Sequence, residues 1–214
     1  MKQNLIIVGC NGNCIDIADT VEAIQSNGGS MSLIGFLDDS PDLAGSDVCG
    51  YPVLGKLEDG PKFAEAFFVN GIGSPTSYSI KRELINKVCP DNNRWATIIH
   101  PKAQVSRHAE IGNGTVLLAN ASVGAFAKVG NHCFLLQNAC VSHHSIVEDY
   151  TSLAVGVCIS GGCHIGSNCY LGSNSVFREN ISIGDKTLVG MGSVVTKSFP
   201  GDQVIIGNPA HPKS

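Results

Sequence analysis

The chain has 214 residues, with 14 Lys and Arg against 18 Asp and Glu, and a formal net charge of −4 at pH 7. This length allows one large domain or two small ones. The acidic balance, without a basic stripe interleaved with aromatic residues, argues against a nucleic-acid partner. Neither a run of eighteen apolar residues nor a signal-peptide pattern occurs, so we expect a cytoplasmic protein that does not span a membrane.

The first 95 residues alternate predicted strands and helices. We predict strands over 5–8, 31–37 and 66–72, a short extended element from 51 to 55, and helices over about 14–25 and 76–88. Strands that alternate with helices indicate a small parallel α/β sheet of the Rossmann-like βαβ type. Ligands of such sheets bind at the carboxyl ends of the strands.

Two segments at such strand ends are candidates for substrate binding. Gly9, Asn11, Gly12 and Asn13 form the turn between the first strand and the first helix, and Asp38-Asp39 follow the second strand. Backbone N–H groups of that turn would hold a diphosphate at the helix N-terminus, while either aspartate would accept hydrogen bonds from a ribose or a base. In the alternative interpretation, the glycines only permit a tight turn and the aspartates begin a solvated loop.

A hexapeptide rhythm begins near residue 96. From Ile99 to Val195 every sixth residue is aliphatic or Phe, and two residues earlier stands a second series of mostly small residues, from Thr97 to Ser193. One large and one small inward position per six residues fit neither a helix nor an alternating strand. They predict a parallel β-helix in which three hexapeptides close one triangular coil, with coils about 4.8 Å apart.

Two further residue types fit this rhythm. Glycines often follow the inward aliphatic residue, and we expect them to serve tight corners through their permissive φ; examples are Gly112, Gly124, Gly130, Gly166, Gly172, Gly184 and Gly190. The chain has nine cysteines, and three of them, Cys133, Cys163 and Cys169, occupy the small inward position. A reduced thiol packs there as a small hydrophobe.

Four motifs surround or enter this repeat in a fixed order: GFLDD at 35–39, YPVLG at 51–55, IIHP at 98–101 and GNPA at 207–210. With them the chain resembles the bacterial sialic-acid O-acetyltransferase and nucleotide-aminosugar N-acetyltransferase group of hexapeptide-repeat acyltransferases. The resemblance implies a nucleotide-sugar-binding domain over residues 1–95 and a left-handed β-helix with a C-terminal tail over 96–214. It also implies acetyl-CoA as co-substrate, no metal, and a homotrimer with sites between neighbouring β-helices.

The corner after Val141 carries the expected chemistry. His143 lies two residues past an inward valine and therefore outside the prism. The resemblance makes it the general base, a task that suits an imidazole. The family usually has Asp or Glu directly after this base, where this chain has His144, so Glu148, Asp149 or an acid from a neighbouring subunit is an alternative partner for the imidazole.

The remaining site residues also follow from the resemblance. Gly161 lies one coil of eighteen residues beyond the base, and its N–H is expected to meet the acetyl carbonyl. Further expected contacts with acetyl-CoA are Ser152, Gly190, Gly207, Asn208 and Pro209. Asn11 and Asn13 depart from the family's GAGGHG turn, although Asn can still donate hydrogen bonds and adopt unusual φ.

Several functions are weighed against one another. The leading hypothesis is acetyl transfer to the amine of a nucleotide-linked 4-amino-deoxysugar, with UDP as the expected nucleotide, in bacterial surface-glycan biosynthesis. O-acetylation of a sialic acid and a non-catalytic nucleotide-sugar sensor are alternatives. A β-helical zinc enzyme is another, since four histidines, His132, His143, His144 and His164, lie in the repeat.

Overall fold

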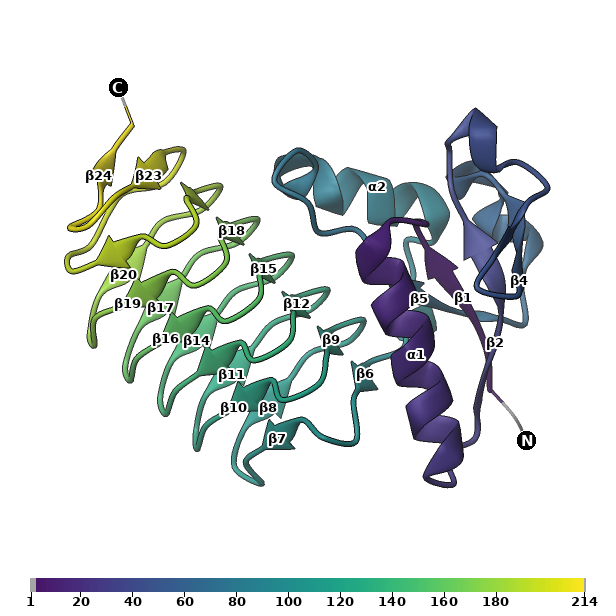
Figure 1. Cartoon of the computed structure of the whole chain (residues 1–214), viewed down its shortest axis with the longest axis horizontal. Coiled ribbons are helices and arrows are strands. Elements are labelled where there is room, and N and C mark those ends of the chain that lie inside the picture. The colour runs from purple at the N-terminus through teal and green to yellow at the C-terminus, as the bar shows by residue number, and fades with distance from the viewer. Residues whose placement is uncertain (1–2, 214) are drawn as a thin grey trace.

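The computed structural model describes residues 3–213 (Figure 1). Its N-terminal part is built on a five-stranded sheet in the order β3-β4-β2-β1-β5. The strands are β1 Gln3–Val8, β2 Met31–Leu37, β3 Asp47–Val48, β4 Tyr51–Gly55 and β5 Phe67–Asn70. All neighbours pair in parallel except β3 with β4, which pair antiparallel. The predicted parallel α/β sheet is confirmed, with β3 as an additional short edge strand.

Two α-helices accompany this sheet: α1 Gly12–Ser26 and α2 Lys81–Val88. Helix α1 buries Cys14, Ile17, Ala18 and Val21, whose spacing gives one apolar face toward the sheet. The predicted second helix becomes α-helical only at Lys81, after a short 3₁₀ turn. The 3₁₀ helices are η1 Pro41–Leu43, η2 Leu57–Lys62, η3 Tyr78–Ile80 and η4 Asn92–Arg94. No helix within residues 3–213 is long and apolar enough to span a membrane.

A parallel β-helix with three faces follows. The first face contains β7 Gln104–Val105, β10 Ser122–Val123, β13 Cys140–Val141, β16 Cys158–Ile159, β19 Val176–Phe177 and β22 Val194–Val195. The second contains β8 Glu110–Ile111, β11 Lys128–Val129, β14 Ile146–Val147, β17 His164–Ile165 and β20 Ser182–Ile183. The third contains β6 Ile98–Ile99, β9 Val116–Leu117, β12 Phe134–Leu135, β15 Ser152–Leu153, β18 Tyr170–Leu171, β21 Leu188–Val189, β23 Val204–Ile206 and β24 His211–Pro212.

The register confirms the predicted coil. Val123 pairs with Val141 and Leu117 with Leu135, so each strand meets the strand eighteen residues further on. The left-handed hexapeptide β-helix that the resemblance implies is the fold of this region.

The interior of the prism is filled by the two predicted series of inward residues, one large and one small. Both are buried in the middle and C-terminal coils, the large one from Leu117 onward and the small one from Thr115 onward. Ile99 is an exception: it is 38% exposed because it lies in the first coil, with no coil beneath it. The predicted inward thiols of Cys133, Cys163 and Cys169 are buried.

Contrary to the prediction, the glycines that follow the inward aliphatic residues do not serve the corners through positive φ. Gly112, Gly124, Gly130 and their equivalents do not have positive φ. Instead, a Cβ on Gly112 would lie 2.5 Å from the carbonyl carbon of Gly130, so these glycines permit close approach of the next coil. The left-handed conformation falls two residues later, at every sixth residue from Gly114 to Gly192. Most of these residues are Gly or Asn, the types that adopt it most readily; the others are Phe126, His132, His144, Tyr150 and Lys186.

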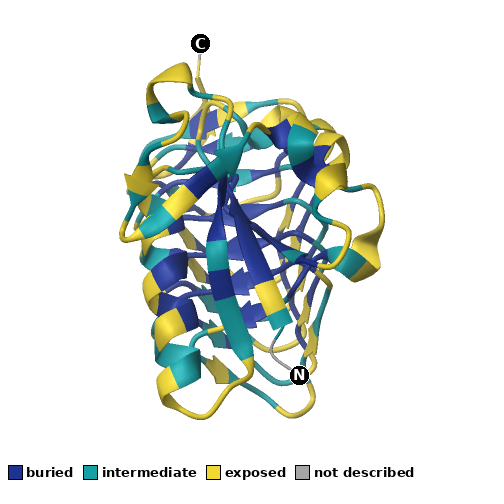
Figure 2. Cartoon of the chain, turned by 90° about the vertical axis from the view of Figure 1, so that its right-hand side faces the viewer, coloured by how far each residue is buried: buried dark blue, intermediate teal, exposed yellow. Residues whose placement is uncertain are grey.

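The N-terminal part packs on the third face of the prism, where α2 lies alongside the coils (Figure 1). Asn70 Nδ2 donates to the carbonyl of His132 at 3.1 Å, and the fully buried Lys81 Nζ donates to Ser152 Oγ at 3.2 Å. A single apolar cluster includes residues of both parts, such as Leu5 and Leu135. Buried residues accordingly fill the centre of the molecule, and exposed residues lie on the outer sides of helices and turns (Figure 2).

Candidate active site

The His143 corner joins β13 on the first face to β14 on the second. Both His143 and His144 are exposed. Their Nδ1 atoms lie 3.1 Å apart and their rings are nearly perpendicular, at 83°. One Nδ1 must donate and the other accept, so the tautomers of the two rings are coupled. If His144 accepts, the Nε2 of His143 keeps its lone pair and can act as a base.

Gly161 forms the floor beneath this imidazole. A Cβ built on Gly161 would lie 2.8 Å from His143 Nε2 and 3.0 Å from its Nδ1. The backbone of the next residue ties the coils together, since Gly162 N donates to the His143 carbonyl at 3.0 Å. A cavity of about 340 Å³ opens here, lined by His143, His144, Gly161, Gly162, Glu179 and Asn180. Sequence reasoning missed Glu179, although its position two coils beyond His143 was a usable signal.

The Gly161 amide differs from those at another corner. Where the second face meets the third, three such amides are capped by a side chain one coil further on: Asn113 N by Asn131, Asn131 N by Asp149 and Ser167 N by Asp185. In the described part of the chain the Gly161 N–H has no acceptor, and the equivalent Ala125 and Glu179 N–H groups of the same corner have none either. A free N–H beside an imidazole is suited to stabilising a negative charge on a carbonyl oxygen.

The two acids considered as partners of His143 are engaged elsewhere. Glu148 Oε1 pairs with His164 Nε2 at 3.0 Å, and Asp149 Oδ1 accepts from Asn131 N at 2.6 Å. Neither of them contacts His143. The side chain that contacts the expected base is instead that of His144.

The four histidines of the zinc hypothesis do not converge within one chain. His132 is fully buried, and its Nε2 lies 2.6 Å from Asn92 Oδ1 at the domain interface. Burial lowers the pKa of His132 to about 4. His164 lies on the second face. Within residues 3–213 no group of three or more His, Cys, Asp or Glu is arranged to hold a metal ion.

Among the expected acetyl-CoA contacts, Ser152 needs correction. Its side chain is buried beneath the N-terminal part and accepts a hydrogen bond from Lys81, so we remove it from the site. Ser152 is buried because its position in the repeat places it on the third face, which the N-terminal part covers.

The other C-terminal candidates lie apart from the His143 corner. Gly190 packs under the last strands, where a Cβ would lie 2.7 Å from Ile206 Cγ2. Gly207, Asn208 and Pro209 form the turn between β23 and β24, and the Gly207 carbonyl accepts from Val194 N at 2.9 Å. This turn covers the C-terminal end of the first face, several coils from His143 along that face.

The turn between β1 and α1 presents a helix N-terminus. Gly9 has a φ of 103°, and Asn11 is the N-cap, with its Oδ1 accepting from Asn13 N at 2.9 Å. The first turn of α1 contains no acidic residue, and a Cβ on Gly12 would meet nothing within 4 Å. Such an open end of a 15-residue helix attracts an anion.

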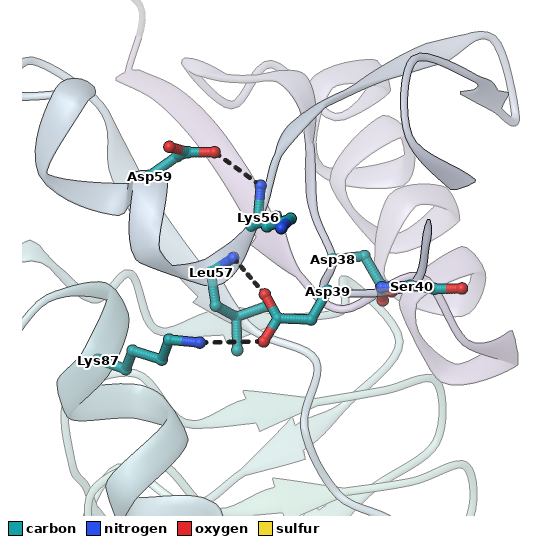
Figure 3. Close-up of polar contacts among 7 residues, drawn as sticks. All are labelled: Asp38, Asp39, Ser40, Lys56, Leu57, Asp59 and Lys87. Carbon is teal, nitrogen blue, oxygen red and sulfur yellow. Dashed lines mark hydrogen bonds and ion pairs between the residues drawn. The ribbon is translucent and has the colours of Figure 1, made fainter. Parts of the chain in front are cut away.

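The two aspartates after β2 differ in what they hold (Figure 3). Asp39 Oδ1 accepts from Leu57 N at 2.9 Å, and its Oδ2 pairs with Lys87 Nζ at 3.2 Å, so this carboxylate ties η2 to α2. Asp38 Oδ1 accepts from the nearby Ser40 N at 2.8 Å, and within residues 3–213 its carboxylate has no other hydrogen-bond partner. Asp38 also lines a cavity of about 480 Å³ beside β4, whereas Asp39 does not. Of the two, Asp38 is the one placed to meet a ligand.

The turn before α1 and the His143 corner lie on opposite sides of one chain. Asn11 Nδ2 donates to the Gly71 carbonyl, and the adjoining Gly73 packs against Phe134 and Ser152 on the third face. His143 stands at the edge between the first and second faces. In a triangular prism that edge lies opposite the third face, so one chain does not bring the two halves of the candidate site together.

Two family models match the chain. The PglD N-terminal domain matches residues 4–88, and the GMPPB C-terminal domain matches residues 94–198. The acetyltransferase domain of PglB from Neisseria gonorrhoeae is similar, with 25% identity and a TM-score of 0.89 over 99% of this chain and 100% of that one.

Two further solved structures are similar over nearly the whole chain. WeeI from Acinetobacter baumannii has 25% identity and a TM-score of 0.85, over 99% of this chain and 100% of that one. PerB from Caulobacter crescentus, solved with CoA and GDP-perosamine, has 24% identity and a TM-score of 0.82, over 99% of this chain and 97% of that one. This similarity shows a shared fold.

Proposed function

The chain belongs to the bacterial nucleotide-aminosugar N-acetyltransferase family of hexapeptide-repeat acyltransferases, and we propose that it transfers acetyl from acetyl-CoA to the amine of a nucleotide-linked 4-amino-deoxysugar. The observation that carries the proposal is the exposed imidazole of His143 against Gly161, whose N–H has no acceptor within residues 3–213. UDP is the expected nucleotide, and surface-glycan biosynthesis the expected setting.

The proposed step needs one base and one oxyanion donor. The acceptor nitrogen attacks the thioester carbonyl carbon while His143 Nε2 takes a proton from that nitrogen. The carbonyl oxygen gains negative charge, which the Gly161 N–H stabilises. The C–N bond is then complete, the C–S bond breaks, and the CoA thiolate receives the proton from His143. His144 acts on the step through its contact with His143 Nδ1.

Acetyl-CoA is proposed to lie toward the C-terminal coils. Its acetyl group would meet Gly161, and its remote part would run past Gly190 toward the turn formed by Gly207, Asn208 and Pro209. This placement agrees with a turn that closes the end of the first face. Because Gly190 and Gly207 are separated from His143 by several coils, only an extended co-substrate reaches both His143 and the C-terminal turn.

The nucleotide sugar is proposed to bind residues 1–95, which we treat as a separate domain. The diphosphate would meet the α1 N-terminus at Gly9, Asn11, Gly12 and Asn13, and Asp38 would accept hydrogen bonds from the ribose or base. The open space at Gly12 and the cavity beside Asp38 support this assignment.

A closed homotrimer is proposed as the active form. The two halves of the site lie on opposite sides of one chain, so the N-terminal domain of one subunit must supply the nucleotide sugar to the His143 corner of another. Closed symmetry is the common solution for such shared sites. Residues 1–95 and 96–214 then serve different sites in the assembly.

A free-thiol assay tests the activity. Acetyl-CoA and a panel of UDP-, GDP- and dTDP-linked amino sugars, with sialic acid as a hydroxyl acceptor, are incubated with the enzyme and CoA release is followed. We expect release with one amino-sugar nucleotide and a product resistant to hydroxylamine, as an amide is. A hydroxylamine-labile product from sialic acid would instead show O-acetylation. Nucleotide-sugar binding without any thiol release would show a sensor.

Mixed oligomers test whether the site is shared. His143→Ala and Gly12→Asp chains, with different tags, are co-expressed, and the hybrid isolated through both tags is assayed at a low nucleotide-sugar concentration, at which each variant alone has little activity. Subunits that share sites should regain part of the activity, because some sites combine two intact halves. A hybrid as inactive as its parents, or a monomeric mass for the active enzyme, would contradict the shared site.

A further inference from the structure

Three aromatic rings form a column along the corner that carries His143. His108, Phe126 and His144 lie one coil apart in succession. The rings of His108 and Phe126 stack with centroids 5.0 Å apart at 17°, and those of Phe126 and His144 lie 5.3 Å apart at 30°. The next residue of the column, Gly162, has no side chain, so the column ends at the cavity beside His143.

We propose that Phe126 is a positioning residue that holds the His144 ring in the orientation in which its Nδ1 meets Nδ1 of His143. The stack thereby serves the task of the carboxylate that the family has directly after the base. This inference rests on the proposed function, in which His143 is the base.

Phe126 is a costly residue for its position. Its φ is 61°, in the left-handed region, and its side chain is 55% exposed. A bulky residue is disfavoured in this conformation, and most equivalent corners have Gly or Asn. Neither backbone preference nor burial accounts for a phenylalanine here. Its contacts with the two histidine rings do.

The pair of histidines needs such a support. An exposed imidazole rotates among broad χ2 orientations, and only some of them bring Nδ1 toward a neighbour. A ring stacked on Phe126 loses that freedom, so the 3.1 Å contact with His143 is kept for a larger share of the time. His143 Nδ1 then has a fixed partner, which keeps Nε2 as the free lone pair.

A double-mutant cycle on kcat tests whether Phe126 acts through His144. The variants are Phe126→Asn, His144→Ala and the two combined, with Phe126→Tyr as a conservative replacement. Asn suits the left-handed backbone, so thermal stability should not fall. We expect Phe126→Asn to lower kcat about three- to tenfold, as the loss of one aromatic contact allows, with KM unchanged. Phe126→Tyr should stay within about twofold of wild type by the same measure.

The combined variant gives the decisive comparison. If Phe126 acts through His144, adding Phe126→Asn to His144→Ala should not lower kcat further. A further loss in that background, a rise in KM or a change in oligomer mass would overturn the inference, since each shows that Phe126 contacts substrate or a second subunit instead.

Tyr150→Asn is the matched control. Tyr150 also has a left-handed backbone, with a φ of 63°, and stacks on a histidine one coil away, His132, at 5.2 Å and 6°. It stands on another corner, and its substitution should leave kcat unchanged. An equal loss in this control would overturn the inference by showing a general effect of corner aromatics. If His143→Ala stays active, the proposed base fails; if it is inactive while Phe126→Asn matches wild type, only the positioning role fails.

Discussion

The imidazole of His143 lies over the Cα of Gly161, so close that a Cβ on residue 161 would come within 2.8 Å of Nε2. These residues are one coil apart and share a corner, which the eighteen-residue register enforces. The absence of a side chain at residue 161 therefore makes room for the ring, and it leaves the N–H beside the ring accessible.

Gly161→Ala should inactivate the enzyme without unfolding it. The added methyl group would overlap the His143 ring and move its Nε2 from the acceptor, so we expect kcat to fall by about 10²-fold or more, within the usual worth of a general base. The residue is on the outer side of a corner with ordinary negative φ, so thermal stability should change little. Ser167→Ala is the control, because Ser167 lies at a different corner, between the second and third faces. Full activity of Gly161→Ala would show that this ring position is not needed.

Gly12→Asp should change stability and substrate affinity in opposite senses. The position is sterically open, and the first turn of α1 has no acidic residue. A carboxylate there interacts favourably with the helix dipole and should stabilise the fold by about 0.3–1 kcal/mol. The same charge repels a diphosphate, so KM for the nucleotide sugar should rise at least tenfold while that for acetyl-CoA stays constant. Gly12→Ala serves as the uncharged control. Unchanged KM in Gly12→Asp would remove the diphosphate from this helix end.

The two aspartates after β2 should separate into a binding and a structural residue. Asp38→Ala should raise KM for the nucleotide sugar at constant kcat, since it would remove only ground-state contacts. Asp39→Ala removes the acceptor of Leu57 N and the partner of Lys87 Nζ, so it should lower the free energy of unfolding by about 1–2 kcal/mol. Kinetics and thermal melts on both variants check this. A lower kcat at constant KM in Asp38→Ala would contradict the division of labour between the domains.

The coil could be predicted from the sequence because the interior of the prism imposes a strict period. The inward residues of the large series, from Leu117 to Val195, stack on one another inside the prism. A side chain of the wrong size at one of these positions would clash or leave a void. The outside obeys no such period. The repeat does not tell which corner amides have a hydrogen-bond acceptor. It also does not tell that Lys87 pairs with Asp39 instead of Asp38, because such pairs depend on side-chain contacts between segments far apart in the chain.

Ser152 shows the same limit. Its place on the third face follows from the register, but nothing in the repeat tells that the N-terminal part covers that face and buries Lys81 against it. At the corners the sequence signal is asparagine and not the glycine after the inward aliphatic residue. Asn120, Asn138 and other Asn stand at the position that has the left-handed backbone.

Lys81→Met should stabilise the protein most at neutral pH. Lys81 is fully buried with Ser152 Oγ as its hydrogen-bond partner, and burial lowers its pKa to about 7 from 10.5. Between those values the unfolded chain binds a proton that the folded chain does not, so wild-type stability falls as pH decreases from about 10.5 to about 7.

Methionine removes this dependence, and we expect a gain of about 2–4 kcal/mol in the free energy of unfolding at pH 7 that disappears toward pH 10.5. Denaturant titrations at several pH values measure it. The adjacent Arg82→Met, whose guanidinium lies over the Tyr150 ring instead of in the interior, is the control and should show no such pH dependence. A gain independent of pH in Lys81→Met would mean that the lysine is charged when folded.

His143→Ala should lower kcat by about 10²–10⁴-fold, the usual worth of general base catalysis, and leave the oligomer intact because the side chain is exposed. His144 is the internal control, since it follows immediately and its Nδ1 lies 3.1 Å from Nδ1 of His143. If it orients or tunes its neighbour, His144→Ala should cost much less, and His144→Asp should be tolerated or improve turnover, because a carboxylate accepts from Nδ1–H and stabilises the imidazolium that forms. Steady-state kinetics with the preferred amino-sugar nucleotide measure all three variants. An inactive His144→Ala beside a nearly wild-type His143→Ala would move the base by one residue, to a ring that lies against Phe126 and not over Gly161.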